Sequence, residues 1–219
     1  MIKSRRVGSI LAGMGMFFLF LAALLAILHM VGTNDGLYYR MQMKADILPE
    51  AGISAQELQA LDESLAVYLA GDAVALDATP FNEKERIHMA DCYDLFVLLR
   101  RAIGVSGTLA VVCIGCGLLL NRRSLRRAAM GGTLGFIAVI AMLGLWGMMD
   151  FDSLFTLFHK LLFTNDLWLL DPRTDLLIRI CPQSMFSTMA FIIGAAEILF
   201  IVIVNLLLRA LPAGFGRHK

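Results

Sequence analysis

The sequence contains only four histidines and lacks the common motifs of enzyme active sites. It has no P-loop, no G-x-S-x-G nucleophile turn, no H-E-x-x-H zinc motif and no glycine-rich dinucleotide fingerprint. Internal repeats, low-complexity tracts and flexible linkers are absent as well. The sequence therefore gives no support to nucleotide chemistry or to a serine nucleophile, and the candidate functional residues are few.

Acidic residues are missing from three segments: the N-terminal end, the loop at 121–127 and the C-terminal tail. The segments 31–101 and 150–185 hold every acid of the chain except Glu197. Cytoplasmic segments of membrane proteins carry an excess of Lys and Arg, so we expect both termini inside and both acidic segments outside. The basic residues of the three segments are Lys3, Arg5, Arg6, Arg122, Arg123, Arg126, Arg127, Arg209, Arg217 and Lys219.

Hydrophobic residues make up 58% of the 219 residues and the mean hydropathy is +0.73, values typical of a polytopic membrane protein. A transmembrane helix needs about 20 mostly apolar residues. The first apolar run is long for a signal peptide and no A-x-A site follows it, so we interpret it as an uncleaved span. Four windows are long enough to cross a membrane, at roughly 8–30, 102–120, 129–149 and 186–209.

These windows predict an all-α polytopic membrane protein with four transmembrane helices and a helical extracytoplasmic domain. The N-terminus and first span occupy 1–30, and the extracytoplasmic domain occupies 31–101. The second span, the basic loop and the third span take 102–149. An extracytoplasmic amphipathic segment, 150–185, precedes the fourth span and the tail, 186–219.

Capping residues predict two helices in the first outer segment. Ser54 and Glu57 form a capping box, leucines recur at helical spacing after it, and Gly71 is a natural stop. Asn82 caps a second helix that carries His88, and nothing in the sequence breaks this helix before the second span. We therefore expect His88 roughly three to four helical turns beyond the membrane boundary.

The segment 155–175 mixes leucine, phenylalanine and tryptophan with one histidine, one arginine, one asparagine and three aspartates. Anchoring to lipid needs none of these polar groups, and a surface loop would not need so many apolar ones. The mixture predicts a segment that lies at a membrane surface and contains reactive residues.

Two short helices are expected around this segment. Asp152 or Ser153 is predicted to cap the first, which carries His159, and 164–166 ends it. Asp171 is followed by proline, a combination that favours an N-cap and a first helical position and predicts a second helix to about residue 180.

Several other residues have structural explanations. Cys113 and Cys116 are spaced as in a redox or metal motif, but the glycines beside them favour close helix packing. Cys92 and Cys181 are weak grounds for a disulfide, so we interpret both as free thiols. Glu197 lies mid-span and is expected to face the bundle interior or a water-filled cavity, with an inter-helix hydrogen bond or a catalytic role.

His88 and His159 are the candidate functional histidines. Asp91 follows His88 by three residues, shares its helix face and is placed to orient the imidazole. His159 is followed by three aspartates within the same segment. Spacing alone leaves open a catalytic pair, interfacial histidines in a structural domain, and a zinc site for which no ligand spacing is present.

Residues 85–91 read E-R-I-H-M-A-D, and residues 158–175 read F-H-K-L-L-F-T-N-D-L-W-L-L-D-P-R-T-D. Together these stretches resemble the lipoprotein intramolecular transacylase family of bacterial membrane proteins, and the resemblance spans nearly the whole chain. It implies transfer of the sn-2 acyl chain of a diacylglyceryl lipoprotein to the α-amino group of the lipoprotein's own N-terminal Cys. It also implies that His88 and His159 are the catalytic pair, in a multi-pass bacterial cell-membrane protein with its site on the outer face.

The residue types suit aminolysis of an ester. The attacking α-amine titrates near ~7.7–8.0, so a histidine of ordinary pKa can accept the proton that it sheds. The amine is itself the nucleophile, so no serine or cysteine is needed. We expect one histidine, with His159 favoured, to be the base and the other to be the oxyanion donor or leaving-group acid. Asp91 and Asp166 would orient the imidazoles, and Arg173 would contact the head group or an oxyanion, or pair with Asp171 or Asp175.

No metal, cofactor or nucleic acid is expected, and the expected partners are diacylglyceryl-modified lipoproteins and membrane lipid. Two other classes of function remain open. A non-enzymatic lipid-binding or sensor protein would use the same outer domain as a receptor, and a metal-dependent membrane hydrolase would use the histidines as ligands. The sequence does not distinguish an oligomer from a monomer.

The distribution of charge predicts the topology. Single cysteines introduced near Asp72 and Asp166 should react with an impermeant thiol reagent added outside the cell, because these segments hold the acids. A cysteine at Arg123 should react only from inside. Labelling of the 121–127 loop from outside would overturn the arrangement.

Overall fold

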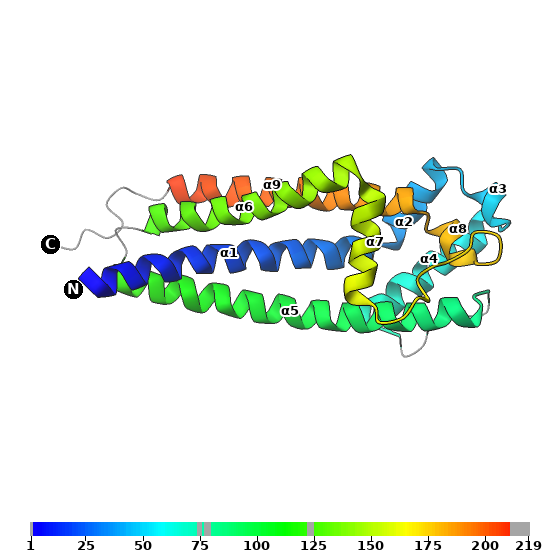
Figure 1. Cartoon of the computed structure of the whole chain (residues 1–219), viewed down its shortest axis with the longest axis horizontal. Helices are drawn as coiled ribbons and strands as arrows, with labels where there is room; N and C mark the ends of the chain where they lie inside the picture. Colours follow the sequence, from blue (N-terminus) through cyan, green and yellow to red (C-terminus); the bar gives the residue numbers. More distant parts are fainter. Residues whose placement is uncertain (1, 74–75, 77–79, 122–124, 211–219) are drawn as a thin grey trace. The chain divides into compact units, whose positions relative to one another are not determined.

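The computed structural model describes residues 2–73, 76, 80–121 and 125–210, and the described residues form helices without β-strands (Figure 1). Four helices are long and apolar enough to cross a membrane, judged by length and composition. The predicted all-α architecture with four candidate spans is confirmed. The basic loop at 122–124 and the tail with His218 lie outside the described residues. The four long helices are α1 (Ile2–Gly32), α5 (Glu83–Asn121), α6 (Leu125–Met149) and α9 (Gln183–Ala210).

The chain divides into two compact units. The membrane unit comprises Met1–Ile27, Arg100–Leu145 and Ile193–Lys219, and the outer unit comprises Leu28–Leu99 and Trp146–Ile192. Both histidines of the predicted pair belong to the outer unit. The shorter helices also lie in the outer unit: α2 (Asp35–Lys44), α3 (Leu48–Ala51), α4 (Ala55–Ala70), α7 (Phe151–Leu162) and α8 (Leu176–Ile180).

Close helix approach organises the membrane unit. A Cβ added to Gly132 on α6 would lie 2.1 Å from the carbonyl oxygen of Gly13 on α1, so only glycine fits there. Gly117 on α5 is similar, since its Cβ would lie 2.9 Å from the backbone nitrogen of Ala12. Gly115 has open space around it. The packing explanation for the C-x-x-C stretch therefore holds for Gly117 and is wrong for Gly115.

Glu197 is fully buried in the membrane unit, as expected for a carboxyl group that faces away from lipid. Neither of its carboxyl oxygens has a hydrogen-bond partner within the part of the chain that the structure describes. The inter-helix hydrogen bond considered from the sequence is thus not found. The apolar core of the same unit is formed by Met16, Phe20, Ala129, Phe136 and Ile201.

The first predicted helix of the outer unit is confirmed as α4. The Ser54 side chain accepts from the backbone N–H of Glu57, and Glu57 accepts in return from the backbone of Ser54. Gly71 ends the helix with φ of 88°, a left-handed conformation that glycine adopts without steric cost. Leu58, Leu65 and Leu69 form the buried stripe of the helix.

Two predicted helix starts are wrong. The helix α7 is capped by Asp150, whose Oδ1 accepts from the backbone N–H of Ser153, so it begins at Phe151 and not after Asp152 or Ser153. Asp171 does not start a helix, because its carboxylate accepts from the backbone N–H of Arg173 and closes a local turn instead. The helix α8 begins only at Leu176.

A buried polar junction joins three helices of the outer unit. The Gln42 side chain on α2 donates to Oδ1 of Asp62 on α4 and to the carbonyl of Ile180 at the end of α8, both at 2.9 Å. Both side chains are almost fully buried. Burial raises the pKa of Asp62 to about 7, with a smaller raising effect from Asp35, although the hydrogen bond from Gln42 acts the other way. The folded protein therefore holds a proton on Asp62 more tightly than the unfolded chain does.

This junction predicts the pH dependence of stability. Below about pH 4 the proton is bound in both states, and between about 4 and 7 only the folded state keeps it, so Asp62 should cost stability as the pH rises through that window. We expect Asp62→Asn to remove on the order of a few kcal/mol of this dependence and to be more stable than wild type at pH 8. Thermal unfolding in detergent at pH 5 and 8 measures it.

The matched control is Glu63→Gln, which neutralises the exposed acid next to Asp62 on the same helix. It should leave the difference between pH 5 and pH 8 unchanged. An Asp62→Asn variant with the pH dependence of wild type would show that Asp62 is ionised in the folded state.

Candidate active site

The outer unit brings His88 and His159 together, although 71 positions separate them in the sequence numbering. His88 lies near the start of α5, and His159 lies in the last turns of α7. Their ring centroids are 6.2 Å apart and the rings are inclined by 32°. Each side chain is 7% exposed, so the pair forms an enclosed site and not two surface residues.

Aromatic rings surround the pair. Phe163 contacts both imidazoles, with centroid separations of 5.1 Å to His88 and 5.4 Å to His159. Phe155 and Trp168 pack on His159 at 4.2 Å and 4.8 Å. An apolar environment disfavours a charged imidazolium, so these surroundings favour the neutral form of both rings.

The protonation of His159 follows from its hydrogen bond. Its Nδ1 lies 2.7 Å from the carbonyl oxygen of Phe155, and a carbonyl can only accept, so Nδ1 carries the proton. The lone pair of the neutral ring is therefore on Nε2. Burial lowers the pKa of His159, and this outweighs the raising effect of the Phe155 carbonyl. His159 consequently presents a neutral imidazole with a proton-accepting Nε2.

His88 has the complementary arrangement. Its Nε2 lies 3.7 Å from the sulfur of Cys92, one helical turn further along α5. Its Nδ1 is buried and has no hydrogen-bond partner among the described residues.

The aspartates expected to orient the imidazoles are engaged elsewhere. Asp91 accepts a hydrogen bond of 2.9 Å from the side-chain amide of Asn165, whose oxygen accepts from the backbone N–H of Leu167. Asp166 is exposed, and its backbone carbonyl accepts from the N–H of Leu169. Asp91 therefore fastens the loop after α7 to α5, and no hydrogen bond joins either aspartate to an imidazole among the described residues.

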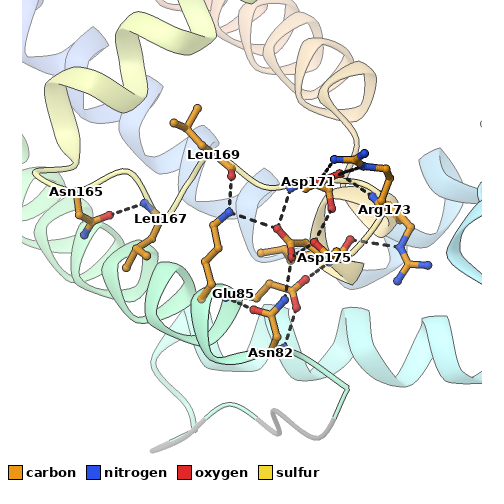
Figure 2. A network of polar contacts seen from close by, with 12 residues as sticks. Asn82, Glu85, Asn165, Leu167, Leu169, Asp171, Arg173 and Asp175 are labelled. Carbon is orange, nitrogen blue, oxygen red and sulfur yellow. Dashed lines mark hydrogen bonds and ion pairs between the residues drawn. The ribbon is translucent and has the colours of Figure 1, made fainter.

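Asp175 is the centre of a second set of contacts, drawn in Figure 2. It is buried, and its carboxylate accepts from the Asn82 amide, the Thr174 hydroxyl and the backbone N–H of Asp171, at 2.8–2.9 Å. Lys84 Nζ lies 3.5 Å away and also donates to the carbonyl of Leu169. Burial raises the pKa of Asp175, but the hydrogen bonds together lower it by more, so the net shift of the pKa is downward. Asp175 is a structural anion, held by the start of α5.

Glu85 shares this network and was recognised from the sequence only as part of a helix cap. Its side chain accepts from the backbone N–H of Asn82 at 2.8 Å, and the Asn82 side chain accepts in return from the N–H of Glu85 at 3.0 Å. The other carboxylate oxygen of Glu85 accepts from the backbone N–H of Leu177 in α8. One buried carboxylate thus caps two helices (Figure 2).

Arg173 pairs with Asp171, one of the two alternatives that the sequence left open. Nε and the NH2 group donate to the two carboxylate oxygens at 2.7–3.2 Å, a fork-shaped contact on the surface. These hydrogen bonds lower the pKa of Asp171 to about 2. The Arg173 side chain is 86% exposed, so it is accessible from solvent.

Sequence reasoning missed the aromatic surroundings and the asparagine that holds Asp91. Phe155, Phe163, Trp168 and Asn165 all lie in the segment singled out for its unusual mixture of residues, and that mixture was the available signal. Regarding the zinc hypothesis, no group of three His, Cys, Asp or Glu side chains within the described ranges is placed to hold a metal ion.

Comparisons with known proteins relate the chain to one family and to solved structures of similar fold. Residues 13–186 match the model of the family described as lipoprotein intramolecular transacylase Lit. The chain is similar to the solved structure of the membrane-integral lipoprotein intramolecular transacylase Lit from Bacillus cereus, with 24% identity, 95% of each chain covered and a TM-score of 0.79. A variant of that protein with a histidine replaced by arginine gives 25% identity, 93% of this chain and 89% of that chain covered, and a TM-score of 0.74.

A comparison with curated proteins finds no match. The similar structures share the all-helical membrane fold described above. The family model matches well over half of the sequence and includes both α5 with His88 and α7 with His159. The chain belongs to the lipoprotein intramolecular transacylase family.

Proposed function

We propose that this protein transfers the sn-2 acyl chain of a diacylglyceryl lipoprotein to the α-amino group of the lipoprotein's N-terminal Cys by histidine acid–base catalysis. The product is a lyso-form lipoprotein. Family membership makes the protein a membrane acyltransferase of lipoprotein modification. The observation that carries the chemical proposal is the buried pair of imidazoles. Nε2 of His159 has a lone pair, and the buried Nδ1 of His88 has no hydrogen-bond partner among the described residues.

His159 is the proposed general base. The attacking amine must lose a proton as it bonds to the ester carbonyl carbon, and Nε2 of His159 is an acceptor whose tautomer is set by the Phe155 carbonyl. When the C–O bond to the glycerol oxygen breaks, the same nitrogen returns the proton to the leaving alkoxide. A positioned base of this kind contributes about 10²–10⁴-fold to the rate.

His88 is the proposed donor to the oxyanion. The tetrahedral intermediate places negative charge on the former carbonyl oxygen, and a donor aimed at that oxygen stabilises it most where water is excluded. Nδ1 of His88 is buried and has no partner in the described part of the chain, which matches a group that gains its acceptor only during the reaction. The aromatic rings around the pair supply the water-poor surroundings.

Nucleophile and ester belong to one lipoprotein molecule, so the enzyme mainly has to hold the lipid head group in an attack geometry. Exposed apolar side chains on and after α7 suit contact with the acyl chains: Leu157, Phe158, Leu161, Leu162 and Leu169. The acidic outer segments support a site on the outer face of the membrane and both termini inside the cell. Asp91, Asp166, Asp171, Arg173 and Asp175 would support the site by shaping the loop around it.

A receptor or sensor that binds lipid without chemistry is the competing function, and one experiment separates the two. Lipoprotein N-termini from cells with and without this protein are compared by mass spectrometry. The proposal expects the lyso-form only in cells that contain the protein. Unchanged N-termini would favour the receptor.

The histidine pair predicts the effect of two substitutions. His88→Ala and His159→Ala should each reduce lyso-form production by at least about 10²-fold, because each removes a proton acceptor or donor from the transition state. The protein should still accumulate in the membrane, as judged by immunoblotting of membrane fractions.

Two other histidines serve as matched controls. His29 packs against Phe96, 5.9 Å between ring centroids, and His218 lies outside the described residues. His29→Ala and His218→Ala should be near neutral. Full activity in either variant of the pair would remove that histidine from the mechanism.

Metal content and product distinguish acyl transfer by histidine from a metal-dependent hydrolase. A metal route predicts stoichiometric zinc, loss of activity with chelators and release of free fatty acid by activated water. The histidine route predicts activity that survives chelators and an acyl chain recovered on the amine. About one zinc per chain that is lost in His159→Ala, with activity restored by zinc, would sink the proposed mechanism.

Both routes lose activity in acid, so the pH profile is a weaker test. Burial lowers the pKa of His159 from its ordinary value, whereas the substrate amine is already protonated below ~7.7–8.0. The loss of activity on the acid side of the pH profile should therefore follow the pKa of the substrate amine. It should not shift when the environment of His159 is changed.

A further inference from the structure

We propose that Cys92 is a positioning residue for His88, whose thiol donates a hydrogen bond to Nε2 and so fixes the ring proton on Nδ1. This rests on the proposed role of His88 as oxyanion donor, because only a protonated Nδ1 can donate. Nothing in the sequence motif assigns a role to Cys92, which was interpreted from the sequence only as a free thiol.

The geometry places the thiol and the imidazole together. Cys92 follows His88 by four residues on α5, and residues four apart share a helix face. The Cys92 sulfur lies 3.7 Å from Nε2, within range of a hydrogen bond to sulfur, and the cysteine is a free thiol. The contact is held within one continuous helix and so does not depend on the loops around the site.

The proton count favours the thiol as donor. A neutral imidazole has one N–H and one lone pair, and the imidazole lone pair is a much better acceptor than a thiol sulfur. If Nε2 carried the proton, it would meet only the weak sulfur acceptor, and Nδ1 would be a buried lone pair. With the thiol donating, Nδ1 becomes a buried N–H that meets no acceptor within the described ranges.

This arrangement gives the two histidines opposite tautomers. The Phe155 carbonyl fixes the proton of His159 on Nδ1 and leaves an acceptor at Nε2. The Cys92 thiol donates to the lone pair of His88 at Nε2, so the ring proton is on Nδ1, which becomes a donor. Aminolysis needs one proton acceptor and one oxyanion donor, and the two local contacts supply one of each while both rings stay neutral.

The direct test is the tautomer of His88 in the full-length protein, which needs no substrate. Nitrogen-15 NMR of histidine-labelled protein in detergent separates protonated from unprotonated ring nitrogens, and the His88 signals are assigned by their loss in His88→Ala. The proposal expects the proton on Nδ1 in wild type. It expects a mixture of tautomers in Cys92→Val and a return to Nδ1–H in Cys92→Ser, whose hydroxyl is also a donor.

Activity gives an independent readout. Cys92→Val should lower kcat about tenfold, equivalent to about 1.36 kcal/mol, with little change in KM, since the contact from Nδ1–H is made to the transition state. Cys92→Ser should recover most of kcat. Cys92→Ala makes the same comparison with a smaller side chain, in case valine does not fit. A loss as large as that of His88→Ala, unrescued by serine, would instead make the sulfur a nucleophile and overturn the positioning role.

Cys113→Val is the matched control. Cys113 is buried on the same helix α5 but belongs to the membrane unit, so its substitution should change neither kcat nor the His88 signals. A wild-type proton on Nε2, or a Cys92→Val variant with wild-type tautomer and kcat, would overturn the inference. Full activity of His88→Ala would instead overturn the proposed function, while the tautomer result would stand.

Discussion

The site depends on the hydrogen bonds that the buried carboxylate of Glu85 accepts. It closes the first turn of α5 through the backbone N–H of Asn82, and it caps the start of α8 through the N–H of Leu177. A buried backbone donor without an acceptor costs about 1–3 kcal/mol. The Glu85 side chain avoids this cost at the starts of two helices. Because His88 lies one turn further along α5, Glu85 also helps to fix the position of that imidazole relative to His159.

Charge and chemistry are separated in the outer unit. The imidazoles sit among phenylalanine and tryptophan rings, whereas the aspartates of the same segments bind backbone amides, asparagines, Lys84 and Arg173. Burial lowers the pKa of His88 to about 4, although the nearby Asp91 carboxylate acts in the opposite direction, and burial also lowers the pKa of His159. Burial therefore favours the neutral form of both imidazoles. Asp91, Asp171 and Asp175, which were expected to support the site, hold the loop in place, and the two imidazoles lie against a carbonyl and a sulfur.

The local patterns predicted much of the fold and little of the site. Four apolar windows and the capping box at Ser54 carry their information within a few residues, so the spans and α4 were predictable. Asp171 looked like a helix cap because the sequence does not show that its carboxylate accepts from both the backbone N–H and the guanidinium of Arg173. The contacts Glu85–Leu177 and Asp91–Asn165 join residues 92 and 74 positions apart, and spacing on one helix could not reveal them. The meeting of the two histidines was expected from a family resemblance and not from any periodicity.

The hydrogen bond from His159 to the carbonyl of Phe155 lies within α7, so this helix itself orients the imidazole of the proposed base. A helix of 12 residues is marginally stable in water, and this one leaves Leu157, Phe158 and Leu161 exposed unless lipid covers them. Lipid at that face would favour the helical state of the segment and, with it, the acceptor lone pair on Nε2. On the proposed mechanism, a protein removed from lipid would therefore lose the orientation of the His159 ring before it lost its fold.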